Sequence, residues 1–412
     1  MPFITLLTGI FIMLLSQTFY RYSVVFHFIT NWRVMDVFTI LLLFIVNIKQ
    51  FNKKLTNKSY SEYSLYLMLM LYVVIGIIAV IRGLEIIGTN AIGIGRYSLL
   101  DIFFIPIFIS IVTSKSKLFT LLKYISLIII PILIILLFTG YKGLHGDRFT
   151  DSFTALGIAN MSVMLTPFLF NKSDKRTVLG NIPISMILLF SFAMIILAQH
   201  RSVWVATTVG IIMVFFLTIR YKFNIYLILK ILLIGFIFIF ALYVIKIYFI
   251  GETAEDALNQ RLTFLHGMKN DPTGYWRFRG WEFVISETIN NNFFWGAGFS
   301  GAGWIDKNTE IVTWEHNQYV HFFRATGLLG IIIYLLFILT SLKYSLDNLS
   351  NTKLSFYKTI LIGNISSFIM TLIYMLFYNQ PCFLWINLAL IIITSRLNIS
   401  EYREISEKAT DS

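Results

Sequence analysis

The sequence predicts an all-α integral membrane protein of about twelve transmembrane helices with one long external loop. Three observations predict it. The 412 residues are 57% hydrophobic and 13% charged, with a mean hydropathy of +0.76, whereas a soluble domain carries about 25% charged residues. Apolar runs long enough to span a bilayer recur along the chain. The loops between these runs are alternately rich and poor in lysine, as the loops of a multi-pass membrane protein are.

Twelve apolar runs approach the roughly 20 residues that a membrane-spanning helix needs. They are residues 3–19, 34–48, 63–81, 97–113, 118–139, 153–170, 179–198, 203–219, 226–250, 319–342, 356–377 and 381–394. The first run has no basic segment before it and no small-residue cleavage site, so we expect a retained helix. The chain then divides into helices one to nine (1–250), a long loop with short helices (251–318), helices ten to twelve (319–394) and a tail (395–412).

Basic residues predict the orientation of these helices, because Lys and Arg in short loops favour the cytoplasmic side. Every loop after an even-numbered helix is basic, through Lys49, Lys53, Lys54, Lys58, Lys115, Lys117, Lys172, Lys175, Arg176, Arg220, Lys222, Lys343, Lys353, Arg396, Arg403 and Lys408. We therefore expect both termini in the cytoplasm and residues 251–318 outside. The net charge of +12 is dispersed in this way and does not indicate a nucleic-acid partner.

Arginine dominates the odd-numbered, external loops, which contain only three lysines. The nine arginines are Arg21, Arg33, Arg82, Arg96, Arg148, Arg201, Arg261, Arg277 and Arg279. A topology signal would use either basic residue, so this excess needs a separate cause. The planar guanidinium binds phosphate through two hydrogen bonds and stays charged at any pH, which suits a lipid-linked phosphate or pyrophosphate. Anchoring to lipid headgroups is the alternative for each single arginine.

Two of these loops carry arginines in a confined setting. Arg201 lies in a hinge of about four residues between two helices, where a charge close to the bilayer indicates a functional site unless it only reaches the headgroups. Arg277 and Arg279 begin what the pattern predicts as a short external helix ending near Ile289. Its apolar face would lie on the membrane, and Arg277 would stand at the helix start, where the helix dipole favours an anion. The residues of that face are Trp281, Val284, Ile285 and Ile289.

A glycine-rich turn over residues 296–303 formally matches the GxGxxG dinucleotide-binding pattern. That pattern needs a preceding strand in a βαβ unit, which a helical membrane protein does not offer, so we reject this interpretation. The glycines instead indicate close passage of the backbone beside a neighbour or a glycan.

Glu315, His316 and Asn317 come immediately before the tenth apolar run. A histidine has an unperturbed pKa near 6.5, which suits it to take a proton from a hydroxyl group, and Glu315 could orient it. The alternative is a structural polar cap. The single cysteine, Cys382, and the five-residue spacing to His321 argue against a metal site, so we expect no metal and no cofactor. Two cations in the spans, Lys230 and Arg324, we interpret as reaching toward headgroups from helix ends.

Together these segments resemble the shared core of bacterial O-antigen polymerases and O-antigen ligases. The residues that carry the resemblance are Arg277 and Trp281, then Asn292-Phe293-Phe294-Trp295-Gly296-Ala297-Gly298-Phe299, then His316-Asn317-Gln318-Tyr319 with Gly327-Leu328-Leu329-Gly330, and the hinge Gln199-His200-Arg201-Ser202. Asn292-Phe293-Phe294 stands where the family usually has Asn-Pro-Leu. The resemblance covers residues 147–330.

The resemblance implies a GT-C-type membrane glycosyltransferase that acts at the periplasmic face. Its donor would be an undecaprenyl-diphosphate-linked oligosaccharide, without nucleotide sugar or metal. His316 matches the family's general base, and Arg201 and Arg277 match the arginines that hold the leaving pyrophosphate. Arg279 has no fixed counterpart. The substrate-binding residues that we expect besides Arg201 and Arg277 are Arg148, Arg279, Glu315 and Asn317.

The sequence favours a polymerase over a ligase, because aromatic residues of the long loop could stack on sugars. A polymerase extends the non-reducing end of a second lipid-linked repeat, whereas a ligase transfers the glycan to lipid A–core. A transporter or flippase is the remote alternative, since transporters place polar residues at mid-membrane. The expected partners are the lipid-linked donor and acceptor and membrane lipids, with room for a chain-length regulator protein.

Overall fold

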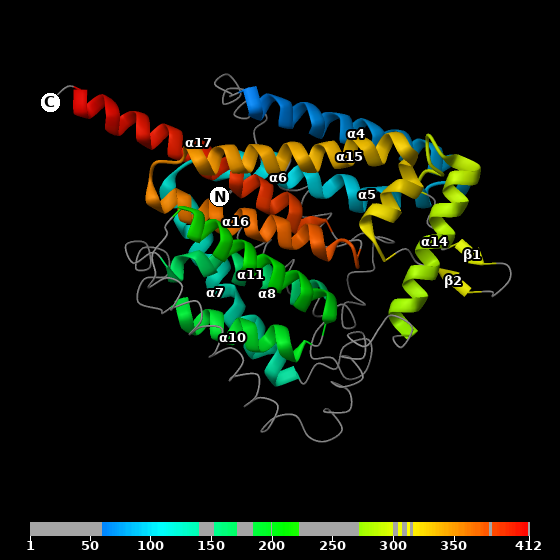
Figure 1. Ribbon diagram of the computed structural model, residues 1–412, viewed down its shortest axis with the longest axis horizontal. Coiled ribbons are helices and arrows are strands. Elements are labelled where there is room, and N and C mark those ends of the chain that lie inside the picture. The colour runs from blue at the N-terminus through cyan, green and yellow to red at the C-terminus, as the bar shows by residue number, and fades with distance from the viewer. Residues whose placement is uncertain are drawn as a thin grey trace.

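The computed structural model describes residues 60–139, 152–170, 184–198, 200–221, 272–299, 304–306, 311–313, 316–378 and 381–410. These residues form a helical bundle with one small hairpin (Figure 1). The elements in chain order are α4 (Tyr60–Ile87), α5 (Asn90–Leu99), η2 (Leu100–Phe103), α6 (Phe104–Ile111), α7 (Lys115–Thr139), α8 (Ser152–Leu165), η3 (Thr166–Leu169), α10 (Ile184–Leu197), α11 (Arg201–Tyr221), α14 (Pro272–Asn292), β1 (Trp304–Asp306), β2 (Ile311–Thr313), α15 (Gln318–Asn351), α16 (Ser355–Tyr374) and α17 (Cys382–Thr410).

Five described helices are long and apolar enough to cross a membrane. They are Ser61–Ile87, Arg201–Arg220, Gln318–Asn351, Ser355–Tyr374 and Cys382–Lys408. Three shorter apolar helices accompany them, over Leu100–Ile111, Thr154–Leu169 and Ile184–Ile196. The prediction of a helical, multi-pass membrane protein is confirmed. The runs 3–19, 34–48 and 226–250 lie outside the described residues, so the total of twelve spans remains a prediction.

The sequence pattern predicted one continuous helix over the run 97–113, but the structure divides this run. Helix α5 ends at Leu99, the 3-10 turn η2 follows, and α6 begins at Phe104. Pro106 explains the break, because it has no N–H to donate to the carbonyl of Ile102 and its ring would clash with that carbonyl in a regular helix.

An aromatic cluster around Tyr72 joins α4, α15 and α17. Tyr72 is fully buried, and its ring stacks on that of Phe322 with 4.9 Å between centroids. The rings of Phe337 and Trp385 lie 6.0 and 5.5 Å away. These large rings fill the centre of that half of the bundle, where interlocking side chains replace lipid.

Small and polar residues join α8, α11 and α16 in the other half. The amide of Asn160 donates to the hydroxyl of Thr371 at 3.1 Å, and a Cβ atom at Gly363 would meet the backbone of Met164. Such small and hydrogen-bonding residues let membrane helices approach closely. Since residue numbers rise along α8 as they fall along α16, these two helices are antiparallel.

Helices α8 and α11 run in the same direction. Val163 lies beside Gly210, and further along both helices Phe170 meets Phe215, with ring centroids 5.8 Å apart. The start of α11 therefore lies at the end of the bundle where α16 finishes. We call this end, where α8, α11 and α15 begin and α16 ends, the site end, and the opposite end the tail end.

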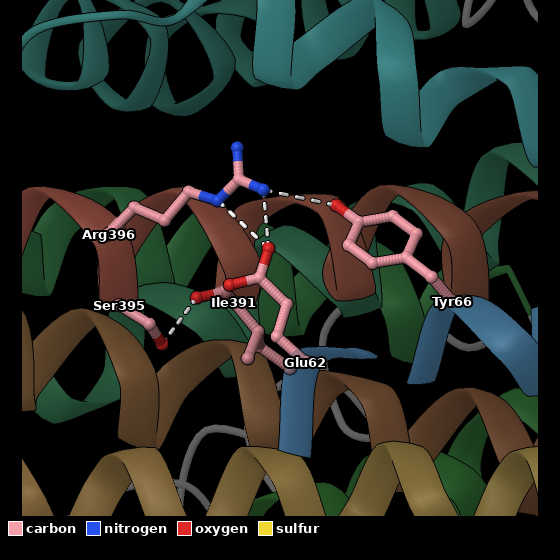
Figure 2. A network of polar contacts seen from close by, with 5 residues as sticks. All are labelled: Glu62, Tyr66, Ile391, Ser395 and Arg396. Carbon is pink, nitrogen blue, oxygen red and sulfur yellow. Dashed lines mark hydrogen bonds and ion pairs between the residues drawn. The ribbon is translucent and has the colours of Figure 1, made fainter. Parts of the chain in front are cut away.

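Two polar networks fasten α17 at the tail end. Figure 2 shows Arg396 of α17 beside Glu62 and Tyr66 of α4. The Arg396 Nε donates to Glu62 Oε1 at 3.0 Å, a second nitrogen of the same guanidinium pairs with that oxygen, and it also donates to the Tyr66 hydroxyl at 3.4 Å. Nearby, Lys115 Nζ and the Tyr357 hydroxyl both donate to the carboxylate of Glu401, each at 2.6 Å.

Helix α14 lies across the site end of the bundle, against α15 (Figure 1). On the predicted apolar face of this helix Val284 is buried while Ile285 and Ile289 are exposed, and contact of that face with the membrane stays a prediction. The face that is buried in the protein runs through Gly280, Val284 and Thr288, because small side chains there let α14 approach its neighbour. The strands that follow pair antiparallel, with Ile305 opposite Val312.

Candidate active site

The predicted site residues that the structure describes come from three places at the site end. Arg201 is the first residue of α11, Arg277 and Arg279 lie on α14, and His316 and Asn317 precede α15. Arg148 and Glu315 lie outside the described residues.

Arg277 and His316 meet through a third residue, Tyr378, in the turn after α16. The guanidinium carbon of Arg277 lies over the Tyr378 ring, 5.2 Å from its centroid. The His316 ring meets the same ring edge-on, with centroids 6.2 Å apart and an interplanar angle of 73°. Two residues that are far apart in the sequence therefore contact the same tyrosine ring.

The helix that carries Arg277 is longer than the sequence indicated. Helix α14 begins at Pro272, and proline is favoured in the first turn because its missing N–H and fixed φ suit that position. Arg277 consequently lies in the second turn. The prediction that it stands at the helix start is wrong. Because the effect of the helix dipole fades within the first turn, the dipole cannot be the main reason for an anion to bind at Arg277.

Arg279 does not share the direction of Arg277. Residues two positions apart on an α-helix point about 200° apart, and Arg279 is exposed while Arg277 is half-buried. Arg201 lies at the site end, in the first turn of α11, and His200 before it is 4% exposed. These two arginines share this end of the bundle with Arg277 but come from separate parts of its surface.

His316 has a strained backbone and Asn317 caps the helix that follows. His316 has a φ of 41°, unlike any other non-glycine residue in the described ranges, and such a conformation often marks a functional site. The Asn317 Oδ1 accepts hydrogen bonds from the backbone N–H groups of Tyr319 and Val320 at 2.9 and 3.2 Å. The polar cap that was the alternative role for His316 is thus provided by the side chain of Asn317.

A break in α15 interlocks with the glycine turn that precedes it. At Gly327 the backbone leaves the helical region, with a φ of 67°. The carbonyl of Arg324 accepts from Ala297 N–H at 2.7 Å, and that of Ala325 from Gly298 N–H at 3.0 Å. In return, Leu328 N–H donates to the carbonyl of Phe293 at 2.7 Å. The turn and the broken helix thus satisfy each other's backbone.

The glycines in this interlock are required by space. Gly296 and Gly298 both have positive φ, and a Cβ atom at Gly296 would lie 2.5 Å from backbone atoms of Ala325. The prediction that these glycines allow close passage of a neighbouring backbone is confirmed. The segment follows a helix and not a strand, which agrees with rejection of the dinucleotide pattern.

The first turns of α15 are buried and unusually polar. Arg324 is 2% exposed, so the expectation that it reaches out toward headgroups is wrong. Gln318 is fully buried, and among the described residues neither its amide nitrogen nor its amide oxygen has a hydrogen-bond partner. A buried amide without partners is costly, and Gln318 comes two residues after His316.

Tyr378 is the site residue that the sequence gave no means to find. It lies immediately after the apolar run 356–377 and in no motif, and only the tertiary fold brings it to Arg277. Its ring stacks on that of Tyr374 with 5.1 Å between centroids and 7° between planes, and Tyr374 is fully buried.

Among the described residues no three His, Cys, Asp or Glu side chains are grouped as metal ligands.

A family model described as O-Antigen ligase matches residues 186–335. The match runs from α10 through the first half of α15, so it includes Arg201, Arg277 and His316 and ends before Tyr378. No curated protein matches the chain. Over residues 186–335 this multi-pass membrane protein is therefore similar to the O-antigen ligase family, and the resemblance that its motifs indicated is confirmed.

Proposed function

We propose that the protein is a polymerase of O-antigen or a related surface polysaccharide. It transfers an undecaprenyl-diphosphate-linked glycan to the non-reducing end of another lipid-linked repeat unit, at the periplasmic face of the bacterial inner membrane. The observation that carries this proposal is the position of Arg277 and His316 about one tyrosine ring, 5.2 and 6.2 Å from its centroid. A cation for a leaving diphosphate and a base for an acceptor hydroxyl are the two groups that glycosyl transfer from such a donor needs.

The reaction divides between these two residues. His316 takes the proton of the acceptor hydroxyl as its oxygen forms a bond to the anomeric carbon of the donor. The bond from that carbon to the diphosphate oxygen breaks, and its electrons leave with the polyprenyl diphosphate. Arg277 stabilises the charge that develops there, and Arg201 holds the second phosphate. A positioned base contributes typically about 10²–10⁴-fold to such a rate.

The arrangement of charge supports this orientation in the membrane. Arg82, Arg201, Arg277 and Arg279 belong to the site end, whereas Lys115 and Arg396 belong to the tail end, where they pair with Glu401 and Glu62. We infer that the tail end and both termini face the cytoplasm, because basic residues of short loops stay there. No metal and no nucleotide sugar takes part in the proposed mechanism.

An O-antigen ligase is the second candidate, and the description of the matching family favours it. A ligase would use the same donor and the same two residues, with lipid A–core as the acceptor. The two candidates differ only in the acceptor that reaches His316.

The lipopolysaccharide banding pattern of a strain that lacks this gene tests both candidates. Lipid A–core with a single repeat unit would support the polymerase, because ligation continues. Bare core, with long polymer remaining on the lipid carrier, would support the ligase. A ladder identical to that of the parent strain would contradict both.

A further inference from the structure

Tyr378 is held between the site and the core of the bundle. Its ring stacks on Tyr374, one turn earlier in the chain, with planes 7° from parallel. Because Tyr374 is fully buried in the fold, it gives the Tyr378 ring a fixed support. The backbone adds to this, since Tyr378 N–H donates to the carbonyl of Tyr374 at 3.2 Å.

Three side chains contact the Tyr378 ring in different ways. Tyr374 is stacked on it, and the guanidinium carbon of Arg277 lies over it, 5.2 Å from the centroid. The His316 ring is close to perpendicular to it, at an interplanar angle of 73°. A guanidinium that rests on an aromatic face is attracted by the ring electrons while its N–H groups, which lie in its own plane, stay able to bind an anion.

We propose that Tyr378 is a positioning residue, whose ring presents Arg277 to the diphosphate and sets the separation between this cation and His316. This inference rests on the proposed function and extends it to a residue in the turn after α16, beyond the segment that matches the family model. A base within about 3 Å of the acceptor hydroxyl and a cation within about 3 Å of a phosphate oxygen must stand several ångströms apart with the reacting carbon between them. One ring that contacts both side chains can set that separation.

The ring and not the hydroxyl carries this role, which gives the test. We would purify the full chain in detergent and measure binding of labelled inorganic pyrophosphate to the wild type, Tyr378→Leu and Tyr378→Phe. We expect Tyr378→Leu to weaken binding about tenfold and Tyr378→Phe to stay within about twofold, since phenylalanine keeps the aromatic face. Phe377→Leu, the same loss of an aromatic ring one residue earlier, should bind as the wild type does.

A double-mutant cycle then separates positioning from a general structural effect. If Tyr378 acts through Arg277, Tyr378→Leu should weaken pyrophosphate binding little further in a chain that already carries Arg277→Gln. Independent losses that multiply, or wild-type binding by Tyr378→Leu, would overturn the inference.

The same variants distinguish this inference from the proposed function when they are tested for polymer formation in the deletion strain. Normal polymer from Tyr378→Leu beside inactive Arg277→Ala and His316→Ala contradicts only the inference. Normal polymer from Arg277→Ala and His316→Ala contradicts the proposed function itself.

Discussion

Basic side chains have different surroundings at the two ends of the bundle. At the tail end Arg396 and Lys115 are bound to Glu62 and Glu401, and a tyrosine hydroxyl completes each group. At the site end Arg277 rests on a tyrosine ring, and no carboxylate of the described residues forms a salt bridge with it. A cation neutralised within the protein can only stabilise the fold, whereas one held on a ring keeps its hydrogen-bond donors for a ligand. Under the proposed function, the tail end therefore serves stability and the site end serves chemistry.

The largest expected effect comes from the site end. Arg277→Ala and His316→Ala should each reduce polymer formation by at least about 100-fold, because one removes the cation that stabilises the leaving group and the other removes the base. The amount of full-length protein in the membrane should not change. Lys343→Ala, an exposed change in the second half of α15, is the control and should leave the polymer ladder as it is. A normal ladder from either site variant would remove that residue from the mechanism.

At the tail end the expected loss is of stability. The side chains of Glu62 and Arg396 are 7% and 23% exposed, so Arg396→Met would leave a buried carboxylate without its cation. We expect the protein to lose about 3 kcal/mol, which a thermal unfolding assay in detergent would detect.

The double variant Glu62→Leu with Arg396→Met should recover most of that loss, because it removes both charges. The activity of the protein that remains folded should stay near that of the wild type in both cases. A specific loss of activity without loss of stability would contradict the division between the two ends.

The glycine turn connects stability with chemistry. Gly298→Ala should cost about 2–3 kcal/mol and should also lower polymer formation, since a Cβ atom there would press on the backbone of α4 and displace the turn that follows α14. Gly88→Ala is the matched control: its φ is also positive, at 61°, but nothing lies within 4 Å of the added atom. It should cost about 1 kcal/mol, from backbone conformation alone. Equal costs for the two variants would show that the close approach is unimportant.

The smallest effect should come from Lys115. Its side chain is 44% exposed and that of Glu401 is 29% exposed, so water already screens the pair. Lys115→Met should change the stability by less than about 1 kcal/mol, which corresponds to a small shift of the unfolding temperature. A loss as large as that of Arg396→Met would mean that exposure does not separate the two networks.

Much of the fold follows from the sequence because lipid imposes a simple pattern. The length of the apolar runs predicted the spans that the structure describes. The sequence also allowed Arg277 and His316 to be singled out as candidate site residues near the one long polar segment. Pro106 shows where the pattern fails, since hydropathy does not register a residue that cannot extend a helix. The start of α14 was missed because residues 272–276, Pro-Thr-Gly-Tyr-Trp, include two weak helix formers and show no helical apolar period.

The contacts that the candidate site residues make were less predictable from the sequence than the residues themselves. Asn317 was expected to bind substrate; in the structure its side chain caps α15, whereas the positive φ lies at its neighbour His316. Tyr378 contributes through tertiary contacts alone. Arg324 was placed in the headgroups because hydropathy does not show that tertiary packing buries it.

The interlock between that turn and α15 has a consequence for how the protein is assembled. In an unbroken helix the N–H groups of Leu328 and Leu329 would donate to the carbonyls of Arg324 and Ala325, yet all four groups bond instead to residues 293–298. A backbone group left without a partner in lipid is costly, so the break cannot exist before its partners arrive. We expect α15 to be inserted as a regular helix and to exchange these bonds only when α14 settles across it. Completion of the active site would then be a late event in biogenesis, and the newly inserted chain would be inactive until that exchange.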